Sequence, residues 1–296
     1  MNAERPPKRG PARELGRFLE IQNLGLNLPF ALAFLFLAAL GLPNLWTVLL
    51  VVVAFVAARN AGHSFNRWAD RRIDAANPRT RDRAVPAGRT SSEFALGFCA
   101  ANAALLVVAA YLLNPLAFVL APVALALVLG YSYTKRVTTF TTAFLGLVEA
   151  VTPAAVFIAV QGTLPLSVLW AVGGLLAWGT AFETIHSLGD LESDRALGLF
   201  SVPQRFGIPV SVVLVPVLHA VALVLLGVFG LALRLTLPYY VALAGMAALA
   251  YLTDRSLALR PTETRVPFRR HFAMGALYLI GTLVALFVPL GPALVL

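Results

Sequence analysis

Charge is scarce in this sequence. Of its 296 residues only 12% are Asp, Glu, Lys or Arg, whereas 59% are hydrophobic. A soluble domain carries about 25% charged residues, because its surface must meet water. The shortage excludes an ordinary soluble domain and indicates that much of the surface meets lipid. The mean hydropathy of +0.81 supports the same conclusion.

Cysteine is nearly absent, and so is any sign of a separate soluble domain. The single cysteine, Cys99, lies inside an apolar run, so an intramolecular disulfide is excluded and a packed thiol is predicted. No linker or low-complexity segment interrupts the apolar pattern. The net charge of +9 does not indicate a nucleic-acid partner, because the basic residues are spread over loops between apolar runs.

Apolar runs long enough to cross a bilayer, about 17–25 residues each, recur along the chain. They predict an all-α membrane protein with about nine transmembrane helices. The narrowest junction lies at Asn114-Pro115, where two spans would meet in a very tight turn. The expected spans are residues 22–41, 45–66, 93–113, 115–133, 140–160, 165–189, 208–230, 235–253 and 271–293.

The positions of Lys and Arg predict the orientation of these spans. With nine spans, all but two of the 23 basic residues fall on one side of the membrane, the exceptions being Arg59 and Arg234. The positive-inside rule then places the N-terminus in the cytoplasm and the C-terminus outside. We expect a cytoplasmic tail over residues 1–21 and one membrane domain over residues 22–296, in the inner (cytoplasmic) membrane of the cell.

Acidic residues number only 14, so their positions are informative. Asn66, Asp70 and Asp74 are spaced by four, which predicts that they share one face of a helix. His186, Asp190 and Asp194 repeat the spacing four spans later, which suggests an internal duplication.

Like charges at this spacing repel each other, and the cost grows near lipid. A divalent metal compensates such pairs naturally, since Mg²⁺ takes one or two carboxylates and fills its other positions with water and phosphate oxygens. The alternative is that neighbouring arginines, such as Arg71, Arg72 and Arg195, neutralise the carboxylates.

These residues resemble the motifs of the UbiA family of membrane prenyltransferases. Residues 66–74 match the family's NxxxDxxxD signature, and residues 190–194 resemble its second DxxxD motif. The resemblance extends to residues 77–80, to Arg83, to residues 131–136 and to residues 198–207. The resemblance covers the chain from the second span to the start of the seventh. Within the family, the sequence is most similar to members of the 4-hydroxybenzoate type and to the related enzymes of menaquinone synthesis.

The resemblance implies a fold and an activity. The family's helices surround a central cavity, which cytoplasmic loops cap; here these loops would be residues 67–92 and 190–207. Mg²⁺ is required. A polyprenyl diphosphate loses its diphosphate, and the allylic cation alkylates an aromatic acid such as a hydroxybenzoate or a naphthoate in quinone biosynthesis.

By resemblance, Asn66, Asp70, Asp74, Asp190 and Asp194 hold the metal. Basic residues at the cytoplasmic helix ends are expected to bind the diphosphate. For Lys135 and Arg136 the alternative is a simple positive-inside anchor, and for Arg83 the six other arginines in its loop are competitors. These expected diphosphate contacts are Lys135, Arg136 and Arg83.

Arg59 shares the helix face of Asn66 and lies roughly 10 Å deeper at 1.5 Å per residue. A charge at that depth should face a cavity, and we expect it to contact the diphosphate or the acceptor's carboxylate. A buried pair with Glu183 or Glu149 is the alternative.

Glu183 and His186 share the face of Asp190 and are expected to bind the acceptor, with His186 as base or hydrogen-bond partner. Close relatives often carry Asp, Tyr and Gln where this chain has Glu183, His186 and Gly189. That difference leaves another acceptor open: a homogentisate, a haem, a chlorophyllide or a glycerol-phosphate lipid. A transporter is the alternative from another class, but it should hold its carboxylates near the bilayer midplane.

Overall fold

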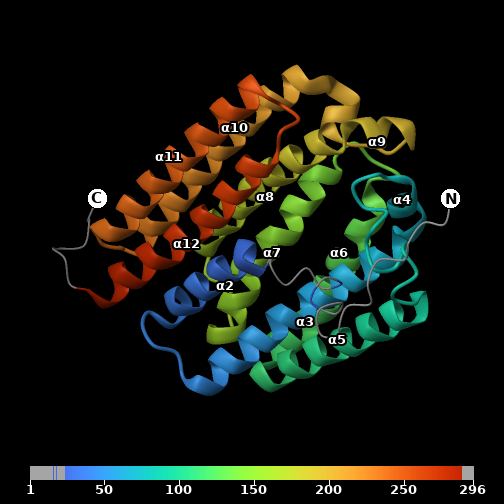
Figure 1. Ribbon diagram of the computed structural model, residues 1–296. Helices are drawn as coiled ribbons and strands as arrows, with labels where there is room; N and C mark the ends of the chain where they lie inside the picture. The colour runs from blue at the N-terminus through green and yellow to red at the C-terminus, as the bar shows by residue number, and fades with distance from the viewer. Residues whose placement is uncertain (1–15, 17, 19–23, 289–296) are drawn as a thin grey trace.

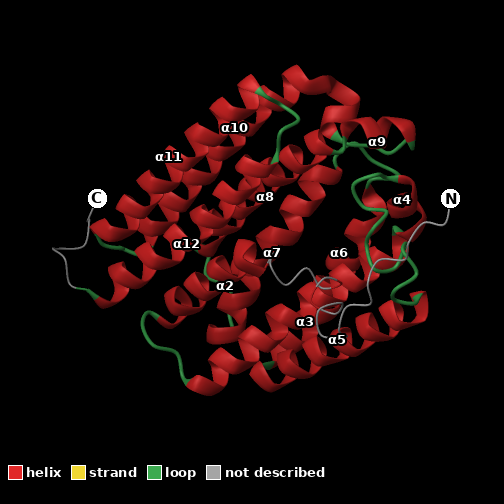
Figure 2. Cartoon of the chain, viewed as in Figure 1, coloured by secondary structure: helices red, strands yellow, loops and turns green. Residues whose placement is uncertain are grey.

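A computed structural model describes Gly16, Phe18 and residues 24–288 of the chain (Figure 1). The predicted tail over residues 1–21 and the placement of the two termini therefore lie almost wholly outside the described residues. Within the described part every regular element is a helix (Figure 2). The helices are α2 Leu24–Ala39, α3 Leu45–Ala69, α4 Arg71–Ala76, α5 Ser92–Leu113, α6 Pro115–Thr134, α7 Thr141–Gln161, α8 Val168–Gly189, α9 Leu191–Ala196, α10 Val202–Ala232, α11 Leu237–Leu259 and α12 Arg265–Phe287.

Each of the nine predicted spans overlaps one of nine long helices of the described part, although the helix of the ninth, α12, begins at Arg265 and so earlier than the predicted residue 271. Seven of these are long and apolar enough to cross a membrane, namely α3, α5, α6, α7, α8, α10 and α12. The described part of α2 has only 16 residues. The other long helix outside this group of seven, α11, carries two tyrosines at its start and Asp254-Arg255 near its end, which lower its hydropathy. The chain is a multi-pass membrane protein.

Local signals in the sequence explain several helix boundaries. Ser91 caps α5 by accepting a hydrogen bond from the Phe94 N–H at 3.1 Å. Asn114 ends α5 and also caps α6, where Pro115 takes the first position. The Asn114 amide donates to the Ile158 carbonyl of α7 at 2.8 Å. The tight turn predicted at Asn114-Pro115 is confirmed, and its cap also ties α5 and α6 to α7.

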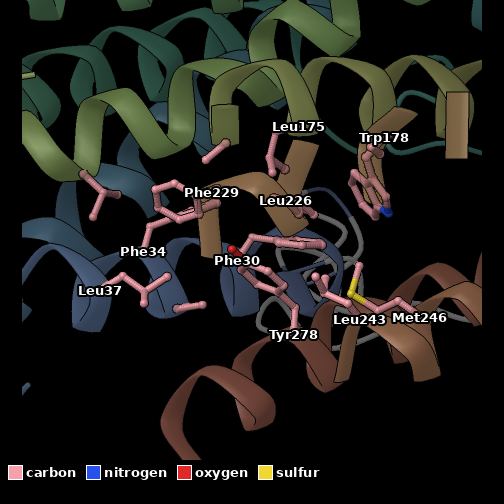
Figure 3. Close-up of a cluster of buried hydrophobic side chains, with 14 of the residues drawn as sticks. Phe30, Phe34, Leu37, Leu175, Trp178, Leu226, Phe229, Leu243, Met246 and Tyr278 are labelled. Carbon is pink, nitrogen blue, oxygen red and sulfur yellow. The ribbon is translucent and has the colours of Figure 1, made fainter. Parts of the chain in front are cut away.

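Six helices enclose the hydrophobic core. Around this group α2 packs on α7, α7 on α8, α8 on α10, α10 on α11, α11 on α12, and α12 back on α2. Large aromatic side chains fill the interior, including Phe30, Phe34, Trp178, Phe229 and Tyr278 (Figure 3). Helices α7 and α8 approach each other closely at Gly146, where an added methyl group would lie 2.5 Å from the Leu176 carbonyl oxygen.

A second group, made of α3, α5 and α6, packs beside the first through α6 on α7 and α3 on α2. The large cavity lies between the two groups, lined mainly by α2, α3, α6, α7, α8 and α12. This corrects one expectation: not every long helix surrounds the cavity. Among the described residues α10 and α11 contribute nothing to its lining, because they pack behind α8 and α12.

A polar network braces this rear layer. His219 of α10 lies 2.8 Å from Asp254 of α11 through Nδ1 and 3.2 Å from Nε2 of His271 of α12 through its own Nε2. Both histidines are buried. Since buried polar groups are costly unless hydrogen-bonded, the network fixes three helices relative to one another.

Candidate active site

The two aspartate motifs have the same backbone geometry, which differs from the predicted one. Asp70 ends α3 with φ −91° and ψ 2°, and Asp74 lies in the separate short helix α4. Asp190 ends α8 with φ −104° and ψ 3°, and Asp194 lies in α9. The expectation that each motif stacks on one continuous helix face is therefore wrong.

One helical turn nevertheless survives at each break. The Asp74 N–H donates to the Asp70 carbonyl at 2.7 Å, and the Asp194 N–H donates to the Asp190 carbonyl at 2.8 Å. Because this single turn is kept, the two carboxylates of each motif still follow each other at one-turn spacing.

Basic groups neutralise Asp70 from the end of α6. Lys135 Nζ lies 2.6 Å from Oδ2, and Arg136 NH2 lies 2.7 Å from Oδ1. The Asn66 amide also donates to Oδ2 at 2.8 Å. The Asp70 side chain is 2% exposed, whereas Lys135 is 28% exposed. The structure thus brings Lys135 and Arg136 into the site, where they bind Asp70.

Asp74 is equally buried and is bound by Arg83 at 2.8 Å, with Arg67 at 4.0 Å. Its second oxygen, Oδ2, is buried and has no hydrogen-bond partner among the described residues. A buried carboxylate oxygen without a donor is costly, and it is a natural position for a cation ligand.

The second motif has fewer partners. Arg79 donates hydrogen bonds to both carboxylate oxygens of Asp190, and its Nε lies 2.7 Å from Oδ1. The Asn77 amide also donates to Oδ1, at 3.5 Å. Burial raises the pKa of Asp190, but the Arg79 hydrogen bonds and charge outweigh it and leave the pKa below its usual value. Asp194 accepts one hydrogen bond, from Ser201 at 3.2 Å. Burial, with the nearby Asp190 charge, raises the pKa of Asp194 to about 6.

The two motifs lie at one end of the molecule, because their loops are tied together. Arg79 follows the first motif and binds the second. The Phe200 N–H, just past the second motif, donates to the Lys135 carbonyl at 2.7 Å. The ends of α3, α6 and α8 therefore converge on one site, which we call the motif end.

A cavity of about 810 Å³ opens beside these motifs. Most of its wall is apolar, and its polar residues are grouped by depth along the helices. Near the mouth lie Asn66, Arg67, Arg79, Arg83, Arg265 and Arg269. Further in lie Tyr131, Glu183 and His186, followed by Asn27, Arg59 and Glu149.

Glu183 is the centre of the middle polar group. It accepts a hydrogen bond from the Tyr131 hydroxyl at 2.9 Å, and its other oxygen lies 3.2 Å from His186 Nδ1. Deeper in the cavity, the Asn27 amide donates to Glu149 at 2.7 Å. Arg59 lines the same cavity, close enough to Glu149 for electrostatic attraction. The sequence-predicted acceptor residues thus share one cavity.

Sequence reasoning missed three arginines and understated one tyrosine. Tyr131 precedes Lys135 by one helical turn, a signal that could have placed both on one face. Arg79 binds across to the second motif, and its place in the family-like stretch 77–80 was the signal that could have singled it out. Arg265 and Arg269 begin a helix far along the chain, so only the fold brings them to the cavity.

The donor set fits Mg²⁺. Within the described part of the chain no three His, Cys, Asp or Glu side chains converge as a closed metal cage. Mg²⁺ needs no such cage, because it is commonly held by one or two carboxylates together with substrate phosphates and water. Each motif offers two carboxylates, and Asp74 Oδ2, which accepts no hydrogen bond from the described residues and lies 4.0 Å from Arg67, is one available ligand position.

Comparisons with known proteins agree with this arrangement. The UbiA prenyltransferase family matches residues 27–275. A 4-hydroxybenzoate octaprenyltransferase of Sodalis glossinidius is 31% identical over 253 residues, 85% of this chain and 87% of that protein. The enzyme of the same name from Aeromonas salmonicida is 32% identical over 257 residues, 86% of this chain and 88% of that protein.

Solved structures show the same fold. A UbiA homolog from Aeropyrum pernix, in its apo form, superposes with a TM-score of 0.81 at 29% identity, covering 89% of this chain and 98% of that one. A UbiA homolog from Archaeoglobus fulgidus bound to GPP and Mg²⁺ superposes with a TM-score of 0.70 at 18% identity, covering 91% of this chain and 99% of that one. The chain belongs to the UbiA prenyltransferase family, and it is a prenyltransferase.

Proposed function

We propose that this enzyme transfers a polyprenyl group from its diphosphate to an aromatic acid, of the hydroxybenzoate or naphthoate type, in quinone biosynthesis. The observation that carries the proposal is the position of the two aspartate motifs at the mouth of an apolar cavity that contains Arg59, Glu183 and His186. The names of the relatives from Sodalis and Aeromonas support the choice of acceptor.

We further propose nine spans in the bacterial inner membrane, with the motif end in the cytoplasm. The distribution of Lys and Arg supports this orientation. Cysteines introduced at Ser92 and at the exposed Ala196, after Cys99→Ala, should react with an impermeant maleimide only from the cytoplasmic side. Labelling of either position from outside would contradict both the span number and the shared site.

In this proposal Asn66, Asp70, Asp74, Asp190 and Asp194 hold Mg²⁺ by their oxygens. The bound metal would neutralise the departing diphosphate, which lowers the barrier to breaking the allylic C–O bond. The GPP and Mg²⁺ bound to the Archaeoglobus homolog support this role for a divalent ion.

The basic residues then exchange partners. Lys135, Arg136 and Arg83 each bind a motif aspartate. Arg83 lines the cavity, and Lys135 and Arg136 lie beside it at Asp70, where the diphosphate would bind. Once metal occupies the carboxylates, these cations can turn to the phosphate oxygens, which take the electron pair of the broken C–O bond.

The cavity wall beyond the motifs suits the rest of the reaction. Its apolar residues from α3, α6 and α7 can take up the prenyl chain and keep water from the allylic cation. Arg59 is placed to bind the acceptor's carboxylate. The ring carbon then forms the new C–C bond, and Glu183 or His186 accepts the ring proton.

The test is direct. The purified protein in liposomes should prenylate 4-hydroxybenzoate or a dihydroxynaphthoate with a polyprenyl diphosphate, as detected by mass spectrometry. Absence of transfer to every aromatic acid tried, with transfer to a neutral acceptor or none, would contradict the proposal.

Glu183 gives a sharper test of the acceptor site. Glu183→Gln keeps the hydrogen bond from Tyr131 but removes the carboxylate, so we expect folding and the KM for prenyl diphosphate to stay the same. The transfer rate or the acceptor affinity should fall by about 10²-fold, the scale of general acid–base catalysis. Unfolding of the variant, or unchanged kinetics, would show that Glu183 only braces the helices.

A further inference from the structure

Two arginines at the cavity mouth differ from the other cations there. Arg265 and Arg269 belong to the first turns of α12 and line the cavity. They are exposed, and neither has a hydrogen bond or an ion pair with any residue that the structure describes. By contrast, the mouth arginines Arg79 and Arg83 already bind aspartates. Two unpaired cations four residues apart share one helix face.

An aromatic surface lies beneath this face. Phe268 lies between the two arginines in sequence and also lines the cavity. Its ring centroid is 5.0 Å from that of Phe182 and 6.3 Å from that of His186. Phe182 and His186 are themselves stacked at 6.5 Å. The rings therefore lead from the mouth to the middle polar group at Glu183.

This combination has a clear chemical complement. Guanidinium groups bind carboxylates through paired hydrogen bonds, and aromatic side chains pack well against another ring. A flat ring carrying a carboxylate matches both features at once.

We propose that Arg265, Arg269 and Phe268 form an entry site that captures the aromatic carboxylate before it reaches Arg59. The inference rests on the proposed function. The diphosphate is assigned to the motif aspartates and to the cations that already bind them, Lys135, Arg136 and Arg79, which leaves Arg265 and Arg269 for the second anion. Positive charge at a cavity mouth also raises the rate at which an anion arrives.

The experiment compares the double variant Arg265→Gln/Arg269→Gln with the wild type in liposomes. The substrates are 4-hydroxybenzoate, its uncharged methyl ester and the prenyl diphosphate. We expect the KM for the acid to rise about tenfold, because the variant loses charge-assisted hydrogen bonds at an exposed site. The kcat and the KM values for the ester and the diphosphate should remain within about twofold of wild type.

The matched control is Arg255→Gln/Arg260→Gln. It removes the same charge from the neighbouring end of α11 and its loop, at exposed residues that do not line the cavity. Its KM for the acid should equal that of wild type. A rise equal to that of the first variant would show that only general surface charge matters, and would overturn the entry site.

Other outcomes also decide the question. An unchanged KM for the acid, or a rise confined to the diphosphate, would overturn the entry site while leaving the proposed function intact. Failure of the wild type to prenylate any aromatic acid would overturn both. Should the double variant fail to fold, the single variants Arg265→Gln and Arg269→Gln decide: each should raise the KM for the acid and not for the ester. An unchanged KM for the acid in both would overturn the proposal.

Discussion

Asp70 and Asp190 each end a long helix with nearly the same backbone angles, but their carboxylates meet different partners. Asp70 is bound by Lys135 and Arg136, which are fixed at the end of α6. Asp190 is bound by Arg79, which comes from a loop and is 46% exposed. The comparison shows that the repeated motif supplies the geometry, and that the surrounding elements decide how its charge is balanced.

The difference has a structural meaning. The first motif is charge-balanced by residues that also hold α3 and α6 together. The second is balanced mainly by one exposed side chain, that of Arg79, and Asp194 accepts a hydrogen bond only from the Ser201 hydroxyl. We therefore expect equal importance of the two motifs for activity and unequal importance for stability.

Removal of metal should have the largest effect, because it disables both motifs at once. EDTA should abolish transfer, and added Mg²⁺ should restore it, as measured by product formation in liposomes. Mg²⁺ and a prenyl diphosphate together should raise the Tm more than either alone, since each motif supplies only two carboxylates. Turnover without any divalent metal would contradict the two-motif site.

Loss of one carboxylate should have the next largest effect. Asp70→Ala and Asp190→Ala should each retain less than about a tenth of wild-type activity, since losing one metal ligand costs several kcal/mol of transition-state stabilisation. Asp82→Ala removes an exposed carboxylate from the same loop and should be near wild type. Substantial activity in either motif variant would mean that the two motifs do not act together.

Stability should separate the motifs, with a smaller effect. Asp70→Ala leaves two partly buried cations unpaired, so it should lower the free energy of unfolding by about 1–3 kcal/mol. Asp190→Ala leaves an exposed arginine and should cost less than about 1 kcal/mol. Thermal unfolding in detergent without metal measures both. Equal losses would show that the surroundings of the two motifs are equivalent after all.

Much of this protein could be predicted from the sequence. The scarcity of charged residues predicts that the protein lies in the lipid bilayer. The apolar runs, bounded by residues such as Ser91 and Asn114, predict the positions of the helices. The motif spacing of Asp70–Asp74 and Asp190–Asp194 indicated a site at helix ends, and the resemblance to the family was confirmed by the comparisons.

Only the tertiary structure decided the rest. The helices end at Asp70 and Asp190. Arg79 binds the second motif, and Arg265 and Arg269 line the cavity mouth. All of these features depend on contacts between distant segments. A spacing pattern reports which residues share a helix face only while the helix continues, because the 3.6-residue period applies within one helix. Which helix faces meet is fixed by packing, as where α7 and α8 approach at Gly146, and the sequence pattern contains no record of it.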